Sequence, residues 1–216
     1  VLRRMLPWPT QGAPPNQAHP IEGLNIAPGA IMNLKPLILA AASLLAAQAH
    51  ATEYNQVQAD KSAIQFSYQQ MGVKMDGKFK KFTSQLAFDP AKPTAARAQF
   101  DAERASVEAG SSDANQEVAG KAWFNSKAFP TARFVSSEVK PLGGNRYEVT
   151  GELSIKGQAR KMVIPATFTA QGATGVFDGA FTLRRGDFNI GEGSWAKFDI
   201  VANDVQVRFR ITAAGK

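Results

Sequence analysis

The sequence predicts a single antiparallel β domain with one short helix. Apolar and polar residues alternate with period two over most of the stretch from Ile64 to Thr212, as in strands with one buried and one solvated face. Short turns rich in glycine and asparagine separate these stretches, so neighbouring strands should run antiparallel. The chain has 216 residues, 44% of them hydrophobic, which is enough for one sizeable core. No repeat or break in composition marks a second domain in this region.

In chain order, eight strands are predicted over residues 63–71, 74–88, 96–104, 131–140, 147–155, 161–169, 174–184 and 205–212. The last is the clearest, because "VQVRFRIT" places Val205, Val207, Phe209 and Ile211 on one face. "YEVTGELSI" and "KMVIPATFT" alternate in the same way. Turns are predicted at Asp89-Pro90, Gly143-Gly144-Asn145, Lys156-Gly157-Gln158 and Gln171-Gly172.

Only the segment from Ser112 to Lys121 reads as a helix. Ser112 or Asp113 is expected to be the N-cap, Glu117 lies early in the segment, and Gly120 lies near its end.

A secretory signal peptide is predicted over residues 32–51, ahead of the domain. Lys35 precedes an apolar run of 12 residues (36–47), and Ala49 and Ala51 form a small-x-small site with cleavage expected after Ala51. That run is shorter than the roughly 20 residues that span a bilayer. Residues 1–31 are interpreted as an upstream extension or a disordered leader, and residues 52–216 as an exported, soluble β domain.

Several kinds of chemistry are excluded from residues 52–216. The chain has no cysteine, and its two histidines, His19 and His50, both precede residue 52. Thiol nucleophiles, Ser-His-Asp triads, disulfides and metal sites built from histidine or cysteine are therefore ruled out there. No acidic pair stands out as catalytic, so we expect no catalytic residues, no metal and no required cofactor.

One local cluster of basic residues stands out, formed by Lys74, Lys78, Lys80 and Lys81. It is either a solvated strand face or a surface that attracts anionic lipid headgroups. A nucleic-acid site would need clustered lysine and arginine together with a recognisable module, so we expect no nucleic-acid partner.

Eight antiparallel strands leave two exposed edges unless the sheet closes or splits into a sandwich. A closed barrel of this size has an interior that side chains fill or leave open for one small ligand. Fourteen phenylalanines against three tyrosines give that interior few polar groups. Such a lining suits an apolar ligand better than a sugar or a nucleotide.

Five stretches resemble, in order and spacing, the YceI-like family of lipocalin-like polyisoprenoid-binding proteins. They are "MGVKMDGKFKKFTSQLAFDP", "WFNSKAFPTARF", "VTGELSIKGQARKMVIPATF", "LRRGDFNIGEGSW" and "DVQVRFRIT". The resemblance covers most of residues 54–212. One departure is that "SSDANQEVAGKAWF" lacks the histidine of the Arg-Asp-x-His motif that many relatives carry before the aromatic stretch, so no role of that histidine is carried over.

The resemblance implies an all-β fold, an extended eight-stranded antiparallel lipocalin-like barrel with a helix near one end. It also implies an elongated apolar cavity that binds the isoprenoid tail of a quinone, a polyisoprenoid or a similar amphiphile. A periplasmic location, frequent homodimers and, in some relatives, pairing with a membrane b-type cytochrome are further implications.

Thirteen apolar residues are candidates for the ligand lining: Phe66, Met71, Phe79, Phe82, Phe100, Trp123, Phe124, Phe129, Phe134, Ile164, Phe168, Phe181 and Phe188. Each could instead pack the core. Two other functions stay open at this point, an enzyme acting on a bound lipid and an interaction module with a filled interior.

Overall fold

The computed structural model describes residues 52–216. The predicted signal peptide (32–51) and the preceding extension (1–31) lie outside the described residues and stay predictions. Within the described part, no helix is long and apolar enough to cross a membrane.

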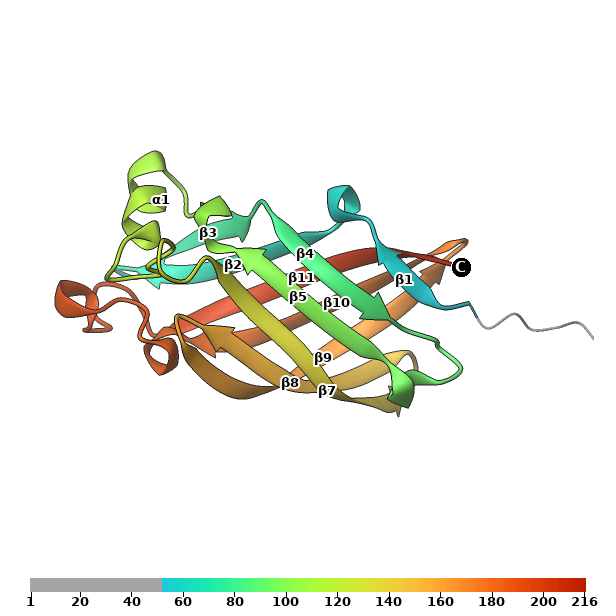
Figure 1. Ribbon diagram of the computed structural model, residues 1–216. Helices are drawn as coiled ribbons and strands as arrows, with labels where there is room; N and C mark the ends of the chain where they lie inside the picture. The colour runs from blue at the N-terminus through green and yellow to red at the C-terminus, as the bar shows by residue number, and fades with distance from the viewer. Residues whose placement is uncertain (1–51) are drawn as a thin grey trace, which may run out of the picture. The chain divides into compact units, whose positions relative to one another are not determined.

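The described residues form one antiparallel sheet with one α-helix (Figure 1). The sheet order is β4-β5-β7-β8-β9-β10-β11-β2-β3-β6, with β1 added beside β11. The elements are β1 (Tyr54–Val57), β2 (Ala63–Gln70), β3 (Val73–Phe79), β4 (Phe82–Ala87), β5 (Arg97–Glu103), β6 (Val107–Glu108), α1 (Ser112–Ala119), β7 (Thr131–Gly143), β8 (Arg146–Ile155), β9 (Gln158–Gln171), β10 (Thr174–Arg184) and β11 (Asp204–Gly215).

The sheet has eleven strands, so the expected count of eight is wrong. The expected strand over 74–88 is broken at Lys80 and Lys81 into β3 and β4. A 3-10 turn, Arg104–Ser106, separates β5 from the short β6, and a second one, Ala59–Lys61, lies between β1 and β2. The short strands β1, of four residues, and β6, of two, could not be predicted from the sequence, because so few residues show no clear periodicity.

The sheet curls so that β4, at one end of the strand order, reaches β1 beside β11. Tyr54 in β1 donates a backbone hydrogen bond to Phe88, just beyond β4, at 2.8 Å, and Phe88 donates one back to Tyr54 at 3.2 Å. Because β1 also pairs with β11, β4 is connected through β1 to the other side of the sheet. This single backbone bridge satisfies the polar groups of Tyr54 and Phe88 and partly closes the curled sheet.

The helix α1 begins at Ser112, one residue earlier than an N-cap at Ser112 would give and two earlier than an N-cap at Asp113. Ser111 is the N-cap, and its Oγ accepts a hydrogen bond from the backbone N–H of Ala114 at 3.1 Å. Gly120 ends the helix, as the sequence predicts.

Two apolar clusters fill opposite parts of the sheet interior. One contains Tyr54, Phe88, Ala96, Val139, Tyr147, Phe168 and Ala213. The other contains Trp123, Leu153, Ile155, Leu183, Phe188, Ile190 and Val201.

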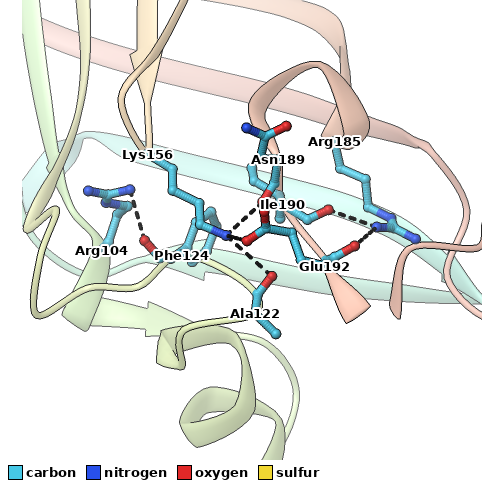
Figure 2. A network of polar contacts seen from close by, with 9 residues as sticks. Arg104, Ala122, Phe124, Lys156, Arg185, Asn189, Ile190 and Glu192 are labelled. Atoms are coloured by element: carbon cyan, nitrogen blue, oxygen red, sulfur yellow. Dashed lines mark hydrogen bonds and ion pairs between the residues drawn. The ribbon is translucent and has the colours of Figure 1, made fainter. Parts of the chain in front are cut away.

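Arg185 fixes the long connection between β10 and β11, although its side chain is only 2% exposed and faces no carboxylate among its contacts (Figure 2). The guanidinium donates to six backbone carbonyl groups at 2.7–3.3 Å, those of Ile190, Gly191, Trp195, Lys197, Val201 and Ala202. Its charge is therefore solvated by peptide dipoles in place of water, and the carbonyl groups of a buried loop gain their donors.

Arg104 is equally buried, at 1% exposure, but has far fewer partners. Its Nη1 donates to the carbonyl of Phe124 at 3.1 Å, its Nε has no partner among the described residues, and it lies 5.5 Å from the ring centre of Phe129. Burial lowers the pKa of Arg104 to about 10. Burial also lowers the pKa of Arg185.

The contrast between the two arginines gives a testable prediction. Arg185→Met should lower the free energy of unfolding by more than about 3 kcal/mol, because it leaves several buried carbonyl groups without donors. Arg104→Met should lower it by less than about 1 kcal/mol, because one hydrogen bond is lost while a poorly paired buried charge is removed. Urea unfolding at equilibrium measures both, and equal losses would contradict the assigned roles.

Candidate ligand-binding site

A cavity of about 700 Å³ lies inside the curled sheet. Most of its lining is aliphatic or aromatic and comes from the inward faces of β2, β3, β5, β7, β8, β9, β10 and β11, with α1 at one end. Side chains therefore do not fill the interior. An interaction module with a filled interior, the alternative left open by the sequence, does not fit this observation. The volume lies in the range typical of small-molecule sites.

Eight of the thirteen residues predicted from the sequence line this cavity. They are Phe66, Phe79, Phe100, Trp123, Phe124, Phe134, Ile164 and Phe181. All come from the alternating strands or the aromatic stretch before β7, where the period-two pattern indicates which side chains face inward.

The other five lie elsewhere. Met71 is 75% exposed at the tight turn between β2 and β3, where its φ of 50° directs it away from the sheet interior. Phe82 directly follows the break at Lys81 and packs against Phe100. Phe129 covers Arg104, while Phe168 and Phe188 are buried in the two apolar clusters.

Several lining residues are absent from the sequence-based candidates. Aliphatic residues account for most of them, including Val205, Val207 and Ile211 on β11, Leu153 on β8 and Leu183 on β10. Alternation in the sequence places Val205, Val207, Ile211 and Leu153 on inward faces, so the period-two pattern carries a signal for them that the mostly aromatic candidates do not include. Trp195 also lines the cavity from a 3-10 turn, where the sequence offered no periodic signal.

Glycines beneath aromatic rings help to keep the cavity open. A Cβ placed on Gly77, Gly151 or Gly179 would overlap the ring of Phe66, Phe134 or Phe209, respectively. Each of these rings lines the cavity, and each occupies the space above a neighbouring strand that a side chain would otherwise take. The rings therefore lie closer to the sheet and leave more free volume at the centre.

One end of the interior is filled by closely packed aromatic rings. The ring centres of Phe88 and Phe168 are 4.8 Å apart, and Phe177 and Tyr147 lie 5.0 and 5.3 Å from Phe88. Tyr54 packs edge-on against Phe168 at 5.0 Å. Such offset and edge-to-face contacts form a dense apolar plug.

The opposite end carries α1 and the connection between β10 and β11. Asp113, Ala114, Glu117 and Val118 of α1 contribute to the lining. The indole Nε1 of Trp195 donates to Glu117 Oε1 at 2.8 Å, which ties the helix to this connection. We define this end as the mouth of the cavity.

Lys156, in the turn between β8 and β9, clamps the segments near the mouth (Figure 2). Its Nζ donates to the Asn189 carbonyl at 2.7 Å, the Glu192 carboxylate at 2.6 Å and the Ala122 carbonyl at 3.4 Å. The lysine side chain is only 7% exposed, so this pair is better protected from solvent screening than a surface ion pair.

Charged groups in the lining are few. Asp113, Glu117 and Arg185 are the lining residues that carry charge at neutral pH, and Arg185 is occupied by its six carbonyl acceptors. Tyr68 donates its hydroxyl proton to the Ala109 carbonyl at 3.1 Å, and burial raises the pKa of Tyr68. Across residues 52–216, no group of three or more histidine, cysteine, aspartate or glutamate side chains is arranged to hold a metal ion.

Comparison with known proteins places this geometry in a family. A UPF0312 protein of Pseudomonas syringae pv. syringae is 30% identical over 166 residues, covering 73% of this chain and 86% of that protein. The crystal structure of Burkholderia cenocepacia BcnA is 44% identical with a TM-score of 0.72 and covers 74% of this chain and all of BcnA.

A polyisoprenoid-binding domain from Saccharophagus degradans, described as implicated in plant cell wall breakdown, shares the fold. It is 13% identical with a TM-score of 0.58, over 77% of this chain and 99% of that domain. The model of the YceI-like domain matches residues 55–213, nearly the whole described part of the chain. The chain therefore belongs to the YceI-like domain family.

Proposed function

We propose that this protein binds and carries a long-chain amphiphile, either a polyisoprenoid or an isoprenoid quinone. The observation that carries the proposal is the unfilled apolar cavity of about 700 Å³, closed at one end by aromatic rings and flanked by polar groups at the other. A tail would enter at the mouth and extend toward the aromatic plug, while the headgroup stays near α1.

The affinity would come chiefly from removing the tail from water. Burial of apolar surface contributes roughly 25 cal/mol per Å², so a few hundred Å² of tail supplies ample affinity without many hydrogen bonds. The family relationship is consistent with this role, since one protein of the same fold is described as a polyisoprenoid-binding domain.

The setting of this function is also a proposal. The predicted signal peptide supports a periplasmic location, and the link to quinones makes a membrane b-type cytochrome a candidate partner. A homodimer is proposed on the resemblance alone. We propose no reaction and no required cofactor, because the charged lining groups are engaged: Arg185 with backbone carbonyls, Glu117 with Trp195, and Asp113 with the Ser112 hydroxyl at 3.4 Å.

Mass spectrometry of an organic extract tests the proposal directly. Protein purified without detergent should release an isoprenoid or another long-chain amphiphile in an amount approaching one molecule per chain. Denatured protein passed through the same steps is the control for lipid carried over from the cells. Recovery of no lipid from the folded protein, even after incubation with isoprenoid-containing vesicles, would contradict the proposal.

Filling the cavity should weaken binding. Ala132 on β7 lines the interior beside Ala102, so Ala132→Phe places a ring in the space the tail would occupy. We expect at least a tenfold loss of affinity for a fluorescent isoprenoid analogue, measured by titration. Val163→Phe is the matched control, because Val163 is 52% exposed and does not line the cavity. An unchanged affinity in Ala132→Phe would contradict binding at this site.

The charges at the mouth predict selectivity for the headgroup. Two carboxylates, Asp113 and Glu117, belong to the lining, and its one guanidinium has no donor to spare. Farnesol should therefore bind at least about tenfold more tightly than farnesyl phosphate at low ionic strength, in competition with the fluorescent analogue. The double variant Asp113→Asn/Glu117→Gln should narrow this difference. Tighter binding of the phosphate to the unaltered protein would overturn the assignment.

A further inference from the structure

Four large apolar side chains are exposed beside the mouth. Met71 is 75% exposed, Val73 61%, Phe198 48% and Ile200 40%. Within residues 52–216, they make up four of the seven large hydrophobic residues that are exposed. We define these four residues as the apolar rim.

The rim is one continuous surface, although its residues are far apart in the sequence. The Met71 N–H donates to the Ile200 carbonyl at 2.7 Å, and the Ala202 N–H donates to the Gln69 carbonyl at 2.9 Å. The turn between β2 and β3 is thereby bonded to the connection that precedes β11. Figure 1 shows both segments at the end of the sheet where α1 lies.

The rim borders the cavity directly. Gln70 and Val201 form a backbone bridge, and both line the cavity. Each is the immediate chain neighbour of a rim residue, Met71 and Ile200, respectively. Two of the rim residues are therefore the immediate chain neighbours of residues in the cavity lining.

We propose that the apolar rim docks the protein on a lipid bilayer, with the mouth of the cavity facing the membrane. The rim side chains come from the turn between β2 and β3, from the first residue of β3 and from the connection before β11, so they do not form a flat face. The ring of Phe198 also lies 4.8 Å from the Arg185 guanidinium. The rim side chains expose on the order of 400 Å², which matches a functional surface patch but is about half of the roughly 800 Å² per partner in a standard protein interface. A bilayer therefore fits this surface better than a second copy of the chain.

The charges around the rim favour insertion over attraction to anionic headgroups. Lys74 lies 3.8 Å from Asp76, and Lys78 and Lys80 lie 3.1 and 3.0 Å from the two oxygens of Glu108. Lys74, the lysine beside the rim residue Val73, is therefore paired with Asp76, whereas Lys78 and Lys80 share the single carboxylate of Glu108. In the second turn, Lys197 and Asp199 are opposite in charge and both exposed. A surface of this kind suits a zwitterionic membrane and should be insensitive to salt.

Flotation with vesicles tests the proposal independently of any ligand. The full chain should float with pure phosphatidylcholine vesicles, and raising the salt from 0.1 to 1 M should change the bound fraction less than twofold. Met71→Asp/Ile200→Asp should reduce binding at least tenfold. Asp tolerates the positive φ at position 71, and neither residue lines the cavity, so the variant should fold. Circular dichroism and an unchanged midpoint of urea unfolding check this.

The matched control is Leu142→Asp/Val163→Asp, which adds the same two charges at exposed apolar positions outside the rim. It should float like the unaltered protein. Loss of flotation in both double variants would overturn the proposal, as would binding that requires anionic phosphatidylglycerol and disappears in 1 M salt. Concentration-dependent dimerisation through the rim without flotation would also overturn it, in favour of a second copy.

A transfer experiment extends the test and rests on the proposed function. The rate at which the bound analogue moves to acceptor vesicles should rise with vesicle concentration if transfer occurs during docking. Met71→Asp/Ile200→Asp should flatten that dependence without changing the equilibrium affinity. A rate independent of vesicle concentration in the unaltered protein would overturn docking as the route of transfer, whereas failure to bind the analogue at all would count against the proposed function instead.

Discussion

The continuous hydrogen bonding of the curled sheet is the constraint on which the rest of the structure depends. Bonds between Tyr54 and Phe88 join β1 to the residue that follows β4, so a backbone bridge connects the end of the strand order to the strand beside β11. Once the backbone is satisfied in this way, inward side chains need no polar partners and can remain apolar. A large cavity is then tolerated, because the wall is held by main-chain bonds and does not depend on dense packing at its centre.

Polar groups enter this apolar structure only where backbone bonding is incomplete. The connection between β10 and β11 has no ladder of its own, and Arg185 supplies the donors for six of its carbonyl groups. Lys156 performs a similar task for the segments around Ala122 and Asn189. Buried cations thus stabilise loops near the mouth by donating to backbone carbonyl groups. Their residue types alone would instead suggest a site for an anion.

Strand positions and inward faces could largely be predicted from the sequence, because alternation on β8, β9 and β11 directly reflects which face is buried. The breaks at Lys81 and Arg104 could not, since they depend on how the sheet curls. Because the curl of the sheet also decides which inward side chains reach the cavity, the lining could be predicted only in part. Phe66 and Phe134 sit over cross-strand glycines and line the cavity, whereas Phe168 lies in the plug, and no local pattern distinguishes these environments.

The strand breaks divide the barrel into two mechanically different walls. All three interruptions fall in the first half of the domain, between β1 and β2, β3 and β4, and β5 and β6, while β7 to β11 are unbroken runs of 10 to 14 residues. Long unbroken ladders resist opening, and short strands joined by turns yield more readily. We therefore expect the side of the barrel built from β1 to β6 to open at a lower free-energy cost than the side built from β7 to β11.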